Sequence, residues 1–323
     1  MSALTKPQSL VANEFIEAGV LVDPTRLVRS RHWAQQLNLA ASSAARSMLL
    51  GAVRSRFRGR GMEFEEVRHY QPGDDIRSID WKVSARTGET FTKLFCEDRE
   101  RPCHLILDQR ASMFFGSGTQ FKSVLAVELA VALAWAALKG GDRVGGQILG
   151  QRNEVDCRAK RHKSAVLVFL HHSVAANHAL LEPIHETRSG TRDHLVGSLT
   201  HSLTECRRIT RPGTAIFVVS DFHDLDADFS RALSTLARHT DATLIQVYDP
   251  FEQSLPVSGD LRISDGQQHR RIRWAAREQQ RYQQLVSDRE QTLQAAAKRA
   301  RARLLLASTD TQARTILGSV YRD

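Results

Sequence analysis

Short apolar segments alternate with longer amphipathic ones after residue 102, and this alternation constrains the fold more than any other feature. Strand-like runs lie at 103–108, 144–149, 215–220, 242–248 and 304–308, and helix-like stretches at 119–138, 164–180, 192–209, 228–239 and 274–301. Such alternation is typical of a mainly parallel sheet with helices on both faces. We therefore expect a doubly wound α/β domain, with residues 154–158 forming a hairpin with 144–149.

Acidic residues follow three of the predicted strands. Asp108, Asp221 and Asp249 each stand at the end of an apolar run. Because parallel strands end at the same edge of a sheet, and open α/β sheets bind ligands at that edge, these carboxylates mark a candidate site. We expect Asp108 and Asp221 to lie on the same edge.

The stretch before the first strand differs in composition from the rest of the chain. Residues 59–101 are rich in charges and turn residues, with short strand-like runs near 64–67, 79–83 and 89–95, so we expect a small β-rich lobe. Candidates for a partner-binding face on it are Arg68, Tyr70, Asp74, Asp75, Arg77, Asp80, Trp81 and Arg86. The alternative is an ion-pair network that holds the lobe together, and we favour this structural role for most of the charges.

The N-terminal part of the chain has a helical pattern. Between residues 25 and 53, apolar side chains recur every three to four positions. The expected organisation is thus an N-terminal helical segment at 1–58, the β-rich lobe at 59–101 and the α/β domain at 102–323.

Composition indicates a soluble globular protein with a sizeable core. Of 323 residues, 41% are hydrophobic and 25% charged, and the longest apolar run, 124–138, is interrupted by Glu128. That run is shorter than the roughly 20 residues of a membrane helix. The four cysteines, Cys96, Cys103, Cys157 and Cys206, have no Cys-x-x-Cys spacing and are expected to be reduced and buried. We expect a cytoplasmic protein without a transmembrane segment, associated with membranes at most through its partners.

The net charge of +9 raises the question of nucleic-acid binding. Arginines alternate along 54–60, and basic residues recur along 298–303. Either stretch could contact phosphate or lipid headgroups, but charged runs more often form solvated surfaces. We expect no nucleic-acid partner.

A dense set of motif residues lies within 59–113. It consists of Gly59-x-Gly61-x-x-Phe64, Arg68-x-Tyr70-x-Pro72-Gly73-Asp74-Asp75, Arg77-x-x-Asp80-Trp81, Ala85-Arg86 and Asp108-x-x-x-Ser112-Met113. In these motifs the chain resembles the bacterial family called domain of unknown function fifty-eight, whose members are similar to von Willebrand factor A domains. The resemblance continues more loosely to about residue 256.

The resemblance implies a fold of von Willebrand factor A type with a metal-ion-dependent adhesion site. The implied metal ligands are Asp108, Ser112, Thr191 and Asp221, while Arg110 stands where the usual Asp-x-Ser-x-Ser loop has its middle serine. Oxygen ligands suit Mg²⁺, but a guanidinium beside them repels it. We expect a degenerate site, with no cofactor, in which Arg110 replaces the metal by bridging to Asp221 or Asp108. The alternative is that Arg110 points into solvent and the remaining oxygens bind Mg²⁺.

The resemblance also implies a function, because the family is known mainly as companions of MoxR-type AAA+ ATPases. We expect a non-enzymatic adaptor that links such an ATPase to client proteins in protein-complex maturation or stress response. The alternative is a metal-assisted phosphohydrolase that uses Asp108 and Asp221. Neither residue lies in a recognisable nucleophile–base motif, which favours the adaptor.

Overall fold

The computed structural model describes residues 14–16, 19–39, 62–71, 74, 76, 79–97, 101–182, 198–253, 255, 259–264, 269–274 and 276–322. The chain forms two compact units, one made of residues 1–46 with 101–323 and the other of residues 47–100. The described residues of the expected N-terminal segment at 1–58, which are 14–16 and 19–39, thus lie in the larger unit. The expected lobe at 59–101 falls almost entirely within the smaller unit.

A six-stranded sheet forms the centre of the larger unit among the described residues. Its strands are β3 (Cys103–Gln109), β4 (Val144–Gly150), β5 (Glu154–Lys160), β6 (Ala215–Ser220), β7 (Asp241–Tyr248) and β10 (Arg303–Ser308). They lie in the order β10-β7-β6-β3-β4-β5, and only β5 is antiparallel to its neighbour. The predicted doubly wound, mainly parallel sheet and the hairpin of β4 with β5 are confirmed. The strand order reverses between β3 and β6, which is where such sheets place ligands.

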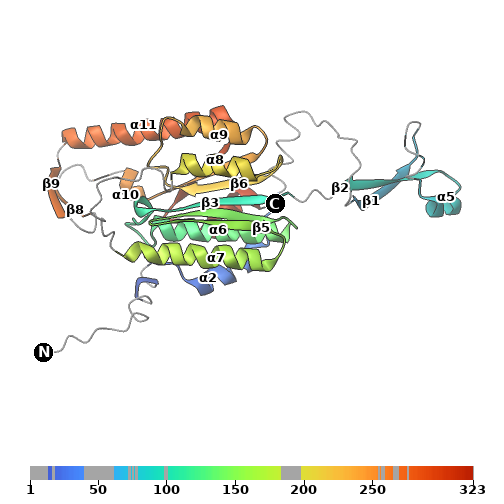
Figure 1. Cartoon of the computed structure of the whole chain (residues 1–323), viewed down its shortest axis with the longest axis horizontal. Coiled ribbons are helices and arrows are strands. Elements are labelled where there is room, and N and C mark those ends of the chain that lie inside the picture. Colours follow the sequence, from blue (N-terminus) through green and yellow to red (C-terminus); the bar gives the residue numbers. More distant parts are fainter. Residues whose placement is uncertain are drawn as a thin grey trace. The chain divides into compact units, whose positions relative to one another are not determined.

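Helices cover both faces of this sheet, as Figure 1 shows. The helices of this unit are α2 (Pro24–Arg29), α3 (Arg31–Ala34), α6 (Lys122–Lys139), α7 (Lys163–His178), α8 (Leu199–Ile209), α9 (Phe229–Ala237), α10 (Pro250–Gln253), α11 (Ala276–Ala300) and α12 (Ala313–Tyr321). One core contains α6, α7 and α12, and the other contains α8, α9 and α11. Leu105 and Leu107 of β3 face the first core and Ile106 faces the second, as the two-residue period of a strand requires. The sequence pattern did not predict α12.

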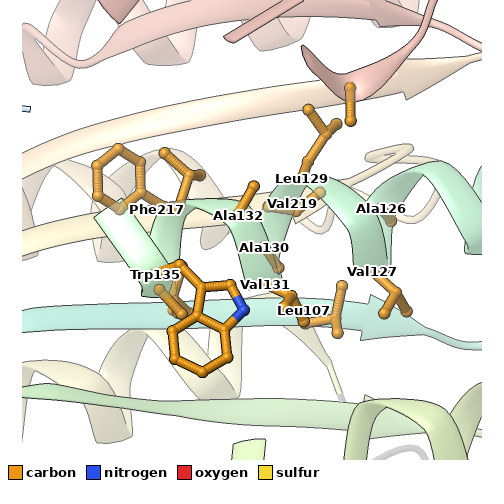
Figure 2. Packing of buried hydrophobic residues seen from close by; sticks show 14 of the residues in the cluster. Leu107, Ala126, Val127, Leu129, Ala130, Val131, Ala132, Trp135, Phe217 and Val219 are labelled. Carbon is orange, nitrogen blue, oxygen red and sulfur yellow. The ribbon is translucent and has the colours of Figure 1, made fainter. Parts of the chain in front are cut away.

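Helix α6 is buried on nearly every side. Its residues from Lys122 to Ala137 are all buried, and Figure 2 shows some of them, among them Leu129 and Trp135, close to Leu107, Phe217 and Val219 of the sheet. Each buried Leu or Val here stabilises the fold by about 1.5–3 kcal/mol. Full burial follows from position, because the sheet lies on one side of α6 and the N-terminal segment on the other.

The N-terminal segment at 19–39 is fastened to α6 and its neighbours by specific contacts. Leu27 of α2 is fully buried, and its carbonyl accepts a hydrogen bond from Nε1 of Trp135 at 3.3 Å. Gly19 has a φ of +71°, and a Cβ there would clash with the carbonyl of Thr119. Only glycine fits such an approach at positive φ, so the segment meets the start of α6 at a fixed point.

Helix α7, continued by the 3₁₀ turn η3 (Ala179–Leu181), is the one described helix that is long and apolar enough to cross a membrane, with a mean hydropathy of 1.3. It packs against β4 and β5, and Val166 and Phe169 are fully buried. A core helix passes the same test, so this finding is weak support for a membrane span.

The smaller unit contains the antiparallel strands β1 (Met62–His69) and β2 (Phe91–Glu97), with helix α5 (Trp81–Thr87) between them. The predicted strand at 79–83 is wrong. Asp80 caps α5 by accepting hydrogen bonds from the amides of Lys82 and Val83, and Gly88 ends the helix in the left-handed region. In the larger unit, a two-stranded hairpin of β8 (Gly259–Ser264) with β9 (His269–Trp274) precedes α11.

Candidate functional site

The candidate site lies at the carboxyl ends of three adjacent strands. Asp108 is near the end of β3, Asp221 follows β6 and Asp249 follows β7. All three side chains are buried, with residue exposures of 0%, 7% and 0%. Because buried carboxylates are costly unless they are paired or hydrogen-bonded, their partners determine what the site can do.

Asp108 is held by Arg110 and Ser220. Nε and Nη2 of Arg110 donate to its two carboxylate oxygens at 2.9 and 2.7 Å, and the backbone amide of Arg110 donates at 3.0 Å. The Ser220 hydroxyl donates at 2.7 Å. Burial acts to lower the pKa of Arg110, but its hydrogen bonds to Asp108 raise that pKa above its ordinary value. Arg110 is therefore a permanent cation at this edge.

Asp221 has a different cation, Lys122, the first residue of α6. Its Nζ lies 3.1 Å from Oδ2 of Asp221 and 2.7 Å from Oε1 of Glu252, and its side chain is only 2% exposed. Ser112 donates to Oδ1 of Asp221 at 3.3 Å, and the amide of His223 donates at 3.0 Å. Burial alone would raise the pKa of Asp221, but the charge and hydrogen bond of Lys122 lower it below its ordinary value.

Asp249 is bonded only to neutral groups among the described residues. The amide and hydroxyl of Ser117 donate to it, together with the hydroxyl of Thr309 and the amide of Phe251. These bonds tie the loop before α6 to the ends of β7 and β10. Asp249 therefore fastens three segments of the edge together.

Phe222 gives this edge an unusual backbone. It follows Asp221 directly, is fully buried and has a φ of +52°, in a region that non-glycine residues seldom adopt. The backbone amide of Phe222 donates a hydrogen bond to the Ser220 hydroxyl at 3.0 Å, and the Phe222 ring packs edge-on against Phe229. Strain of this kind persists only where surrounding contacts hold it. Here those contacts fix the direction of the loop that carries Asp221.

The residues expected to bind a metal do not fit one. Asp108 uses all its acceptor positions on internal donors, and Arg110 and Lys122 place two positive charges at the edge. Mg²⁺ needs free oxygen ligands and near-octahedral geometry. Among the described residues, no three His, Cys, Asp or Glu side chains cluster as metal ligands do. Thr191, the fourth expected ligand, lies outside the described residues.

Some of the charged candidates on the β1–α5–β2 unit have partners within that unit. Nη2 of Arg68 lies 2.7 Å from Asp74, whose backbone carbonyl accepts the hydroxyl of Tyr70 at 3.3 Å, and Asp80 caps α5. Arg86 and Trp81 are exposed. Asp75 and Arg77 lie outside the described residues.

Two of the site's principal residues were not among the sequence candidates. Lys122 and Glu252 lie 130 positions apart, and nothing local in the sequence indicates that they meet. The available signal was a lysine at the start of a predicted helix that is mostly apolar apart from Glu128. Because an unpaired lysine is almost never fully buried, that position implied a carboxylate partner from elsewhere in the chain.

The fold and site define a doubly wound α/β protein. At the edge of the sheet where such proteins bind ligands, internal ion pairs occupy the carboxylates of Asp108 and Asp221. The sequence matches, over residues 66–302, the family described as "Protein of unknown function DUF58". The chain belongs to this family, as its motif residues suggested.

Similar proteins include "Uncharacterized protein Rv1480" of Mycobacterium tuberculosis, 30% identical over 65% of this chain and 62% of the relative. The chain thus spans under two thirds of that relative's length. "Uncharacterized protein YeaD" of Bacillus subtilis is 32% identical over 28% of this chain and 20% of the relative.

Solved structures with some likeness include BatB from Bacteroides thetaiotaomicron, with a TM-score of 0.44 and 13% identity over 68% of this chain and 97% of that one. An aerotolerance-related membrane protein from Bacteroides fragilis has a TM-score of 0.38 and 13% identity, over 68% of this chain and 96% of that one.

Proposed function

We propose that this protein is a non-enzymatic, cytoplasmic adaptor that binds a MoxR-type AAA+ ATPase and its client proteins, in protein-complex maturation or stress response. The side chain of Trp81 carries the proposal. It is 68% exposed at the start of α5, in a unit where Arg68 pairs with Asp74 and Asp80 caps the helix. Ile76 of the same unit is 65% exposed. Exposed tryptophans are enriched among the residues that dominate the energy of protein interfaces.

The geometry of the sheet edge supports binding over catalysis. A general base or a metal-assisted hydrolase needs a carboxylate that can accept a proton or coordinate a cation in the reaction. Asp108, Asp221 and Asp249 instead accept hydrogen bonds from donors within the protein. The phosphohydrolase alternative would require Asp108 and Asp221 to release Arg110 and Lys122, so we do not favour it.

The proposal is tested by complex formation with a MoxR-type ATPase from the same cell. Gel filtration of the purified proteins is run with ATP, with ADP and without nucleotide. We expect the two proteins to co-elute in at least one of these three conditions. Replacing Trp81 with Ala should weaken the complex about tenfold or more, the effect of losing an interface hot spot.

A matched control is Ile209→Ala, which removes an apolar side chain from the larger unit. Ile209 is 60% exposed, comparable to Trp81. This variant should bind as tightly as the unmodified protein. Absence of any complex in all three nucleotide states would contradict the adaptor role. Equal loss in both variants would show that Trp81 is not the contact.

A further inference from the structure

We propose that Arg110 and Lys122 together replace a divalent cation at the sheet edge, so that the site neither binds nor needs Mg²⁺. This inference concerns the chemistry of the edge and does not depend on the adaptor role. The proposal gives Lys122 and Arg110 the same function, which is to supply positive charge to a buried carboxylate, although the two residues lie on different elements. Arg110 neutralises the carboxylate of β3, and Lys122 neutralises the carboxylate that follows β6.

Hydrogen bonding at Asp108 leaves no position for a metal. A carboxylate has about four acceptor positions, two on each oxygen. Oδ1 of Asp108 accepts the amide and Nε of Arg110, and Oδ2 accepts Nη2 of Arg110 and the hydroxyl of Ser220. The fork of the guanidinium matches both oxygens, which makes this pairing stronger than a single contact. A metal would have to displace Arg110 to reach the carboxylate.

Asp221 is nearly as fully occupied. Its Oδ1 accepts the hydroxyl of Ser112 and the amide of His223, and its Oδ2 accepts Nζ of Lys122. Lys122 also bonds Glu252, and its ammonium lies 5.8 Å from the centre of the Phe115 ring. The ammonium thus lies between two carboxylates and neutralises part of their charge, as a bound cation would. Ser112, an expected metal ligand, uses its hydroxyl as a donor to Asp221.

The charges at the edge also disfavour a second cation. Arg110 has a side chain only 19% exposed and Lys122 only 2%, so solvent screens neither charge fully. A divalent ion between Asp108 and Asp221 would meet both of them across a poorly screened site. The two internal cations therefore exclude the ion both by occupying its ligands and by repelling it.

A single substitution should open the site. Arg110→Ser removes the guanidinium from Asp108 and places a hydroxyl oxygen on the same loop. Asp108 would then have free acceptor positions at the start of the loop that carries Ser112. A buried carboxylate that has lost its partner gains most from a new cation, so a divalent ion becomes favourable there.

The experiment is titration with Mn²⁺, followed by electron paramagnetic resonance, of the unmodified protein and three variants. The variants are Arg110→Ser, Arg110→Ser with Asp108→Asn, and Arg101→Ser. Arg101 is a matched control because it bonds Asp241 at the opposite edge of the sheet, with side-chain exposures of 21% and 23%. Thermal unfolding of each protein with EDTA and with Mn²⁺ is recorded in parallel.

We expect no stoichiometric Mn²⁺ binding by the unmodified protein or by Arg101→Ser up to millimolar ion. Arg110→Ser should bind one Mn²⁺ with an affinity at least tenfold higher than that of the unmodified protein. Adding Asp108→Asn to this variant should abolish the binding. The Tm of Arg110→Ser should rise with Mn²⁺, which reports rescue even if this variant unfolds in EDTA. Stoichiometric binding by the unmodified protein, or no gain in a folded Arg110→Ser, would overturn the proposal.

Discussion

At the residue scale, each of two cations neutralises a different carboxylate at the sheet edge. Arg110 bonds Asp108 through a forked pair of hydrogen bonds, and Lys122 lies between Asp221 and Glu252. Because both pairs are largely buried, removing one partner leaves the other charged and desolvated. Such a loss is far more costly than the net value of the intact pair.

Lys122→Met is therefore expected to lower the free energy of unfolding by about 3–5 kcal/mol. Lys122 and Asp221 are 2% and 6% exposed, so solvent does little to relieve the unpaired carboxylate. The double variant with Asp221→Asn should recover much of the loss, giving a large coupling energy in a double-mutant cycle. Urea unfolding measures both. A loss below about 0.5 kcal/mol in the single variant would mean that this ion pair does not stabilise the fold.

Sequence reasoning reached part of this site. The ends of apolar runs located Asp108 and Asp221, and the position of Arg110 predicted its bridge to one of two carboxylates, of which the structure shows Asp108. Lys122 was missed because its partners lie 99 and 130 positions away in the sequence. Local sequence patterns do not predict contacts between residues so far apart. Whether the edge binds any metal stays a prediction.

At the element scale, α5 shows how a local pattern can mislead. Ile79, Trp81 and Val83 alternate as in a strand, but Trp81 and Val83 lie between the cap residue Asp80 and Gly88, so a short helix forms there instead. The cap also explains why Asp80 is buried in a polar stretch. Helices with a longer apolar pattern, such as α6, were predicted to within a few residues because burial repeats over several turns.

Asp80→Ala should weaken α5 by about 1 kcal/mol, the usual cost of losing a helix cap. Amide exchange within residues 81–87 should therefore be about fivefold faster. Asp80→Ser, which keeps a capping oxygen, should stay near the unmodified rate, and so should Lys82→Ala at an exposed position of the same helix. Unchanged exchange together with lost partner binding would make Asp80 a binding residue instead of a cap.

At the scale of the whole molecule, the strand–helix alternation was sufficient to predict the doubly wound sheet. Each predicted strand was a short apolar run, and parallel strands buried on both faces require that pattern. The place of the N-terminal segment was not predictable, because burial of Leu27 against α6 depends on contacts about 100 positions away. The larger unit thus combines residues 19–39 with 101–182, 198–253 and 276–322 around one sheet, and internal ion pairs occupy the polar edge of that sheet.

The most direct test of this occupied edge is the Tm of the unmodified protein with excess EDTA and with 1 mM Mg²⁺. A native site with a dissociation constant of about 10 μM would add about 2.7 kcal/mol to the free energy of unfolding at that concentration. Such a gain raises the Tm by several degrees in a protein of this size. We expect the two Tm values to agree within experimental error, because Arg110 and Lys122 already neutralise Asp108 and Asp221. A Tm several degrees higher with Mg²⁺ would contradict the account.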